Sequence, residues 1–373
     1  MRALLLLSLS LLAVGCAHLP EAPPAAGDWE RHRLCGPDTR PERRGAARPD
    51  YCLEIARVGP ALARPRAVAL LVPGMFQNGR VFDLWPERGV SFARFLARHG
   101  IEPWVFHVRG IGASDYPPRS SLDDIAIDDL PRAIDWLSAH RGRKILVLGH
   151  SQGAMTLKAS LAGLSRCAEG ACFDPEVARA RQARVSAAGF FAGSVALTGE
   201  NLQLRFLAGT GGLLGGLPPL VVDRFPGRRL GLWAHRHLPA ALFDALLRRE
   251  NTPLELREAM LSRTVEATTG KNLAQLSDGL AFGSTRSGAH RWTEALGLIT
   301  LPVVQVTFEH DPLSPPRATY RDDFRHLGSR QKHFLMTAGQ GHGDFQASVK
   351  GHDSQLRAVG LLLELGASDQ AVW

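Results

Sequence analysis

The sequence predicts an α/β fold, in which a mostly parallel β-sheet is flanked by helices. The first observation is composition: 45% of the 373 residues are hydrophobic and 21% are charged, which suffices for a packed core and excludes a disordered chain. The second is that, from Tyr51 onward, short apolar runs alternate with longer amphipathic segments. The third is the run Lys144–Leu148, which leads through a glycine-containing turn into a helix-like segment.

Six apolar runs predict the buried strands of this sheet. They are Ala67–Val72, Trp104–Val108, Lys144–Leu148, Val185–Phe191, Val303–Phe308 and His333–Thr337. Between the second and third runs, residues 121–140 carry apolar side chains at roughly helical spacing. This segment begins with Ser121 and then Asp123 and Asp124, residue types that favour a helix N-terminus. It is predicted to be a crossover helix.

Residues 194–300 interrupt the alternation and predict a mainly helical cap, inserted into a core of residues 51–193 and 301–373. Helix-like segments in the cap are Leu238–Arg249 and Leu254–Thr268. Residues 206–222 combine leucines and valines with Gly and Pro, and predict either a mobile apolar lid or a rigid covering packed on the core.

The N-terminus predicts export. Residues 1–15 place Arg2 before an apolar stretch that is too short to span a bilayer and that ends in small residues. The segment Ala13-Val14-Gly15-Cys16 resembles the lipobox of bacterial lipoproteins, in which the cysteine is acylated and becomes the new N-terminus. The resemblance implies a lipid on Cys16, a tether over residues 16–50 and attachment to the periplasmic face of the outer membrane. An ordinary cleaved signal is the alternative.

Four cysteines remain beside Cys16, an even number that suits an exported chain in an oxidising compartment. Proximity in the sequence favours the disulfides Cys35–Cys52 and Cys167–Cys172, although four cysteines allow three pairings. Four free thiols in a cytosolic protein are the alternative.

The net charge of +8 does not predict a nucleic-acid partner. Only five of the 44 cationic residues are Lys, the Arg residues are scattered along the chain, and no nucleic-acid-reading motif accompanies them. His235 and His237 invite a metal interpretation, but a spacing of two on a helix points side chains about 200° apart. We expect solvated cap residues there, and neither a metal nor another cofactor.

The segment Gly149-His150-Ser151-Gln152-Gly153 carries the clearest chemical signal. It follows a predicted buried strand and precedes a predicted helix. In this context two glycines permit a sharp turn that lifts a serine hydroxyl above the sheet and presents it at a helix N-terminus. The context predicts that Ser151 is a nucleophile.

With this motif, residues 51–365 resemble the α/β-hydrolase family. The expected fold is an α/β-hydrolase fold with a helical cap inserted after the sixth strand. The strand ending in Leu71–Phe76 is similar to the loop that supplies an oxyanion-hole amide, although Pro73 stands where most members have His. The resemblance implies that the backbone N–H groups of Met75 and Gln152 form the oxyanion hole. Arg109–Asp115 is similar to a segment that is architectural in the family.

The resemblance also implies an acid and a base, in the chain order Ser, acid, His. Asp311 follows a predicted strand and is the expected acid, with Glu309 as the alternative. His342 follows the last predicted strand through a glycine-rich loop and is the expected base. His352, its rival, falls within the next helical segment.

These residues predict a serine hydrolase that cleaves carboxylic esters through an acyl-enzyme on Ser151. Its expected partner is a small-molecule or lipid-like ester, besides the membrane reached through the N-terminal lipid. An acyltransferase with the same triad is a second interpretation. A catalytically inactive envelope-binding lipoprotein is a third.

Overall fold

The structure of the protein is a computed structural model, which describes residues 28–40, 50–115, 120–168, 170–197, 246–348 and 352–367. Several predictions lie outside these residues. They concern the signal and Cys16, the segment 206–222, and the pair His235 and His237.

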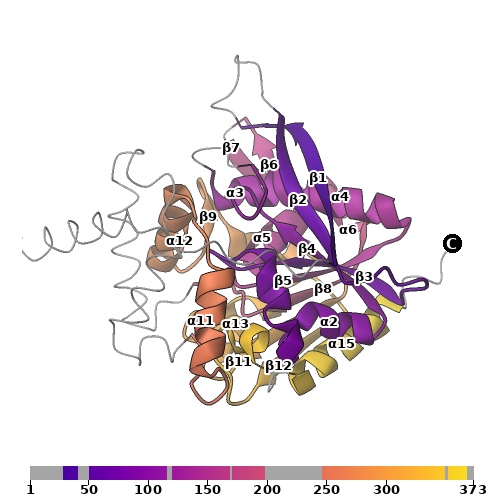
Figure 1. The fold of residues 1–373 in the computed structure, drawn as a ribbon. Coiled ribbons are helices and arrows are strands. Elements are labelled where there is room, and N and C mark those ends of the chain that lie inside the picture. Colours follow the sequence, from indigo (N-terminus) through magenta and orange to yellow (C-terminus); the bar gives the residue numbers. More distant parts are fainter. Residues whose placement is uncertain are drawn as a thin grey trace, which may run out of the picture.

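An eight-stranded sheet forms the centre of the fold, in the order β1-β2-β4-β3-β5-β8-β11-β12 (Figure 1). The strands are β1 (Trp29–Pro37), β2 (Asp50–Val58), β3 (Ala67–Val72), β4 (Ile101–His107), β5 (Ile145–His150), β8 (Val185–Phe191), β11 (Val303–Phe308) and β12 (Lys332–Thr337). The six strands from β4 to β12 are parallel, whereas β1 and β2 run antiparallel to their neighbours. The predicted mostly parallel sheet is confirmed, and all six predicted strands are present. Five of them are buried as predicted, but β12 lies at the edge of the sheet and none of its residues is buried, because it has a neighbouring strand on one side only.

Helices cover both faces of the sheet. The helices α4 (Leu130–Arg141), α5 (Gln152–Leu161) and α6 (Pro175–Gln182) lie on one side, and α2 (Phe92–Arg98) and α15 (His352–Ala367) lie on the other (Figure 1). Shorter helices are α13 (Pro316–Asp322) and α14 (Asp344–Ala347).

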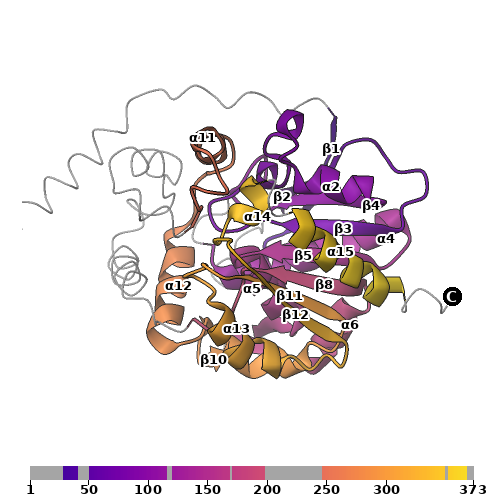
Figure 2. The same ribbon diagram turned by 90° about the horizontal axis from the view of Figure 1, so that it is seen from below.

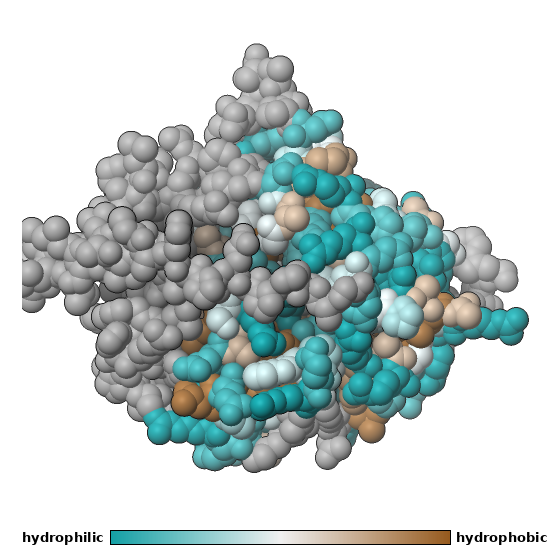
Figure 3. All heavy atoms as spheres, in the orientation of Figure 1, coloured by the Kyte–Doolittle hydropathy of each residue, from teal (hydrophilic) through white to brown (hydrophobic). Residues whose placement is uncertain are grey.

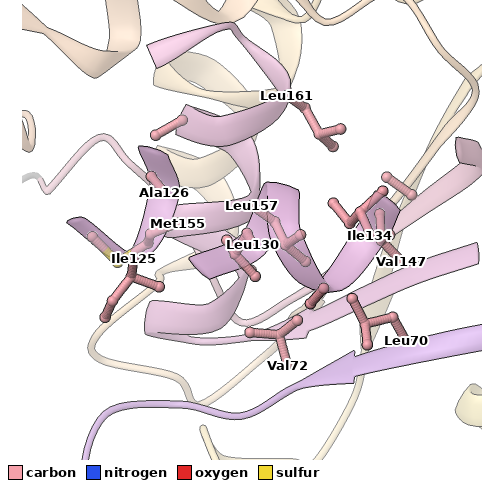
Figure 4. Packing of buried hydrophobic residues seen from close by; sticks show 14 of the residues in the cluster. Leu70, Val72, Ile125, Ala126, Leu130, Ile134, Val147, Met155, Leu157 and Leu161 are labelled. Carbon is pink, nitrogen blue, oxygen red and sulfur yellow. The ribbon is translucent and has the colours of Figure 1, made fainter. Parts of the chain in front are cut away.

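The alternation of side chains along β3 divides the core into two layers. Leu70 and Val72 face one side, where Leu130 and Leu157 pack against them (Figure 4). Leu71 belongs to the second layer, with residues of α2 and α15. Since a strand that is buried on both faces has no polar side, the sequence shows it as a continuous apolar run.

The predicted crossover helix is confirmed. It begins as α3 (Leu122–Asp124), passes through a π-helical turn at Ile125–Asp129 and continues as α4. Ser121 and Asp124 form a reciprocal capping box at its start. The carboxylate of Asp129 accepts hydrogen bonds from the buried guanidinium of Arg109. Arg109 therefore links the loop after β4 to the crossover helix, which is a structural role.

The N-terminal arm differs from the prediction. Residues 29–37 were expected in the tether, but they form β1 at the edge of the sheet. Only Leu34 is buried in this strand, so its sequence has no apolar periodicity. Charged residues such as Arg31 and Arg33 suit an edge strand because they discourage pairing with another chain.

One of the two predicted disulfides is present. Cys35 and Cys52 lie directly opposite each other in the pairing of β1 with β2, and they form a disulfide.

The second predicted disulfide, Cys167–Cys172, is wrong: both residues are free thiols. They lie on the hairpin β6 (Leu164–Cys167) and β7 (Gly170–Phe173), where Cys167 is opposite Gly170 and Cys172 is opposite Ser165. The two cysteines are therefore diagonal rather than direct neighbours across the hairpin.

The described part of residues 194–300, the predicted cap, contains α11 (Leu254–Arg263), α12 (Gly270–Phe282) and a small hairpin of β9 (Arg286–Ser287) and β10 (His290–Arg291). These residues are called the cap from here on. The helix expected over Leu254–Thr268 ends at Arg263, and residues 246–249 of the other expected helix are not helical. In Figure 2, α11 and α12 lie at the end of the molecule opposite the C-terminal end of α15.

The described surface in Figure 3 is largely hydrophilic, with hydrophobic residues in small separate groups. Among the described residues, none of the helices combines the length and the apolar character needed to cross a bilayer.

Candidate active site

Ser151 occupies a sharp turn between β5 and α5. Its φ of 52° lies in the left-handed region, which is strained for a residue with a side chain. The two glycines of the motif make the turn possible. A Cβ on Gly149 would lie 2.6 Å from the backbone nitrogen of Ala154, and one on Gly153 would lie 2.4 Å from the carbonyl oxygen of Val72. The turn predicted from the sequence is present.

The surroundings hold Ser151 beside the loop that follows β3. Its backbone N–H donates to the carbonyl of Phe191, at 2.9 Å. A Cβ on Gly74 would lie 3.2 Å from the Cβ of Ser151, so the two backbones are in close contact. Met75 follows Gly74 directly, and Gln152 is the first residue of α5. Met75 and Gln152 are expected to supply the oxyanion-hole amides. They are the sequence neighbours of Gly74 and Ser151, the two residues in contact.

His342 and Asp311 contact each other at the ends of β12 and β11. The Nδ1 of His342 lies 2.9 Å and 3.0 Å from the two carboxylate oxygens of Asp311. The same carboxylate accepts hydrogen bonds from the backbone N–H groups of Leu313 and Ser314, at 2.8 Å and 3.0 Å. The buried Asp311 is therefore fixed, and it can hold His342 with Nε2 available as a base.

The two alternative residues lie elsewhere. The carboxylate of Glu309 is exposed and accepts a hydrogen bond from the backbone N–H of Gly339. Its side chain lies 3.7 Å from the ring of His310. His352 is the first residue of α15, and its side chain is outside the described residues. The structure brings together Asp311 and His342.

His150 was not singled out from the sequence, but it connects the Ser151 turn to the His342 loop. Its Nε2 lies 2.9 Å from the carbonyl oxygen of His342, and the two rings are 4.9 Å apart. Burial and the neighbouring His342 hold the pKa of His150 well below its ordinary value, so the ring is neutral and its N–H donates to that carbonyl. The only sequence signal was its place next to Ser151.

Asp344 was also missed as a site residue. Its buried carboxylate accepts hydrogen bonds from the backbone N–H groups of Gly341 and Arg248, each at 2.9 Å, and from the side chain of Asn251, at 2.7 Å. The first of these donors belongs to the His342 loop and the other two belong to the cap. Asp344 thus joins the loop that carries His342 to the start of the described cap segment.

A nucleophile, a paired histidine and two backbone amides are the components of nucleophilic catalysis at a carbonyl. Within the described ranges, no group of three or more His, Cys, Asp or Glu side chains is arranged to hold a metal ion.

Fold and site together define an α/β hydrolase. The sequence model described as "Alpha/beta hydrolase family" matches residues 69–349, and the chain belongs to this family. Among curated proteins, Triacylglycerol lipase 1 of Arabidopsis thaliana is 34% identical over 121 residues. This match covers 29% of the chain and 29% of the lipase, so the chain matches less than a third of that relative's length.

Solved structures of other hydrolases are similar in fold. The monoacylglycerol lipase of Paleococcus ferrophilus has a TM-score of 0.56 and 17% identity, covering 84% of this chain and 99% of that one. A soluble variant of the monoglyceride lipase of Saccharomyces cerevisiae has a TM-score of 0.60 and 13% identity, covering 94% and 98%. At these identities the likeness concerns the fold alone.

Proposed function

We propose that the protein is a serine hydrolase that cleaves carboxylic esters. The observation that carries the proposal is the contact of His150, the neighbour of the strained Ser151, with the backbone of His342. The ring of His342 is in turn paired with Asp311. Residues from separate parts of the chain thus lie close together. The fold does not require this arrangement, so it supports a function where the fold alone would not.

In the proposed reaction, the Oγ of Ser151 attacks the ester carbonyl while Nε2 of His342 takes the hydroxyl proton. Asp311 holds the imidazole and stabilises its protonated form. The backbone N–H groups of Met75 and Gln152 bind the oxyanion of the tetrahedral intermediate. His342 then gives the proton to the departing alcohol, which leaves an acyl-enzyme. A water molecule, deprotonated by His342, hydrolyses this intermediate and restores Ser151.

We further propose that the ester is lipid-like. The support is the sequence match to a triacylglycerol lipase, which covers 29% of the chain. Buried apolar side chains also adjoin the His342 loop, where a Cβ on Gly343 would lie 3.0 Å from Leu247 and 3.5 Å from Met260.

A series of p-nitrophenyl esters from acetate to palmitate tests the proposal. We expect turnover with kcat/KM rising to at least about eight acyl carbons, because burial of each methylene contributes about 0.8 kcal/mol. Ser151→Ala should lose several orders of magnitude in kcat, whereas the control Ser165→Ala on β6 should retain wild-type activity. A labelled fluorophosphonate should modify the wild type at Ser151. An active Ser151→Ala variant contradicts the serine mechanism, and a preference for acetate contradicts the lipid-like substrate.

We also propose that the protein is a lipoprotein anchored through Cys16 at the periplasmic face of an outer membrane. The support is the lipobox-like segment before Cys16. Because β1 begins at Trp29, the tether would comprise residues 16–28 and could span at most roughly 45 Å.

Intact-mass analysis of membrane fractions tests the anchor. The expected product begins at an acylated Cys16, and Cys16→Ala should release the protein from the membrane fraction. A wild-type product with an unmodified N-terminus, or one whose fractionation does not respond to Cys16→Ala, contradicts lipidation. Cys167→Ala is the matched control, because it removes a free thiol outside the signal.

A further inference from the structure

The loop after β3 contains a strained residue. This loop, residues 74–78, is called the oxyanion loop below because it carries Met75. Phe76 has a φ of 63°, in the left-handed region that a bulky side chain disfavours. Such a conformation persists only where the surrounding structure fixes it.

The cap holds the oxyanion loop through its backbone. The N–H of Asn78 donates to the carbonyl of Thr264, at 2.8 Å, and the N–H of Glu266 donates to the carbonyl of Phe76, at 2.6 Å. Between them, Gln77 and Val265 form an isolated antiparallel bridge. The segment that follows α11 therefore runs along the oxyanion loop as a short strand would.

The Glu266 side chain adds a second set of contacts. One carboxylate oxygen accepts a hydrogen bond from the side-chain amide of Asn78, at 2.6 Å. The other accepts from the backbone N–H of Gly112, at 2.8 Å, in the loop that follows β4. A single cap carboxylate thus joins the loops of two neighbouring strands. Hydrogen bonds to a charged acceptor are stronger than those to a neutral one.

We infer that Glu266 is a positioning residue for the oxyanion hole, acting through Asn78 and Phe76 on the adjacent Met75. The inference rests on the proposed function and deepens it, because it makes the cap a part of the catalytic scaffold. Without the carboxylate, the contacts with Asn78 and Gly112 are lost, and the backbone N–H of Glu266 is held less firmly against the carbonyl of Phe76. The Met75 N–H then moves from the place where the oxyanion forms.

The expected effect is on the transition state. The oxyanion is present in the tetrahedral intermediate and absent from the bound ester, so a displaced amide lowers kcat and leaves KM nearly unchanged. Displacements of about 1 Å can cost about 100-fold in rate. A role confined to stability would lower the melting temperature and leave the kcat of the folded enzyme at the wild-type value.

The experiment compares Glu266→Ala and Glu266→Gln with the control Glu258→Ala, which removes an exposed carboxylate from α11. For Glu266→Ala, we expect kcat to fall about 10- to 100-fold, with KM within about twofold of wild type. The affinity for a trifluoromethyl ketone, which forms a tetrahedral adduct with Ser151, should fall by the same factor. Glu266→Gln should be intermediate, because its amide oxygen can accept only one of the two hydrogen bonds. Glu258→Ala should match the wild type.

The rate of fluorophosphonate labelling at Ser151 provides a readout that needs no ester turnover, and it should fall with kcat in both Glu266 variants. Wild-type kcat, ketone affinity and labelling rate in Glu266→Ala would overturn the inference. If Glu266→Ala does not fold, the same results in the isosteric Glu266→Gln would overturn it. A wild type that labels but hydrolyses no ester would instead count against the proposed function, while a slowed labelling rate in the variants would still support the role of Glu266.

Discussion

At the scale of single residues, environment separates side chains that look equivalent in the sequence. Asp311 and Glu309 are two positions apart in one loop. Asp311 is buried and accepts hydrogen bonds from His342 and from two backbone amides. Glu309 is exposed and bonds a backbone amide of the neighbouring loop. We therefore expect the two carboxylates to differ widely in their effect on catalysis.

The comparison of Asp311→Asn with Glu309→Gln tests this expectation. Asp311→Asn presents an amide to Nδ1 of His342 and favours the wrong tautomer, so kcat on the preferred p-nitrophenyl ester should fall by about 10³- to 10⁴-fold. Glu309→Gln should stay within about twofold of wild type. Thermal unfolding of both variants checks that they are folded. A larger loss in Glu309→Gln would show that the acid is misassigned.

At the scale of elements, a buried ion pair fixes the place where the chain leaves the sheet for the cap. Lys158 on α5 lies 2.5 Å from Asp323, and both side chains are fully buried. The ammonium also donates to the carbonyl of Gly193, and the other oxygen of Asp323 accepts from the backbone N–H of Val195. The pair thus links Gly193 and Val195, which follow β8, to α5. This is the helix that begins beside Ser151.

Removing one partner of this pair should be costly. Burial lowers the pKa of Lys158, whereas the charge of Asp323 and its hydrogen bond raise it, so Asp323 favours the charged ammonium. Lys158→Met leaves the Asp323 carboxylate uncompensated, and we expect a loss of about 3–5 kcal/mol in the free energy of unfolding by urea. The double variant Lys158→Met with Asp323→Asn should recover much of this loss. Additive losses in the double variant would contradict the coupling.

At the scale of the whole molecule, the antiparallel edge is joined to the parallel sheet by a buried carboxylate. Glu54 on β2 contacts His107 on β4 and accepts a hydrogen bond from the backbone N–H of Ala113, at 2.8 Å. Arg31 on β1 lies 3.3 Å from the other oxygen. Burial by itself raises the pKa of Glu54, but these partners outweigh it and lower the pKa to about 2, from an ordinary value of 4.5.

This shift predicts a pH dependence of global stability. Because the folded-state pKa of Glu54 lies below the unfolded value, its contribution is fully present above pH 4.5 and is lost as the pH falls toward 2. The contribution is on the order of 3 kcal/mol. Urea unfolding between pH 2 and pH 6 should show a shallower acid dependence for Glu54→Gln than for wild type. Glu258→Gln, which changes an exposed carboxylate, is the control and should behave like the wild type. If the stability of Glu54→Gln depends on pH as steeply as that of the wild type, Glu54 does not cause the acid dependence.

The sequence was sufficient for features that neighbouring residues specify. Continuous apolar runs indicated the five buried parallel strands β3, β4, β5, β8 and β11, because burial on both faces leaves no polar side. The glycines around Ser151 indicated the strained turn, because only glycine fits the close contacts at those positions. Proximity along the chain was not sufficient for the disulfides, because it favoured two and only Cys35–Cys52 is present.

Only the tertiary structure decided what depends on distant segments. The edge strand β1 has a polar sequence and is specified by its pairing with β2. The register of the hairpin places Cys167 and Cys172 diagonally, as free thiols. The contact of His150 with the backbone of His342 joins residues 192 positions apart, and that of Glu266 with Gly112 spans 154. Local periodicity encodes which face of an element is buried. It does not encode which polar groups meet across the fold, because those contacts form only after the whole core has packed.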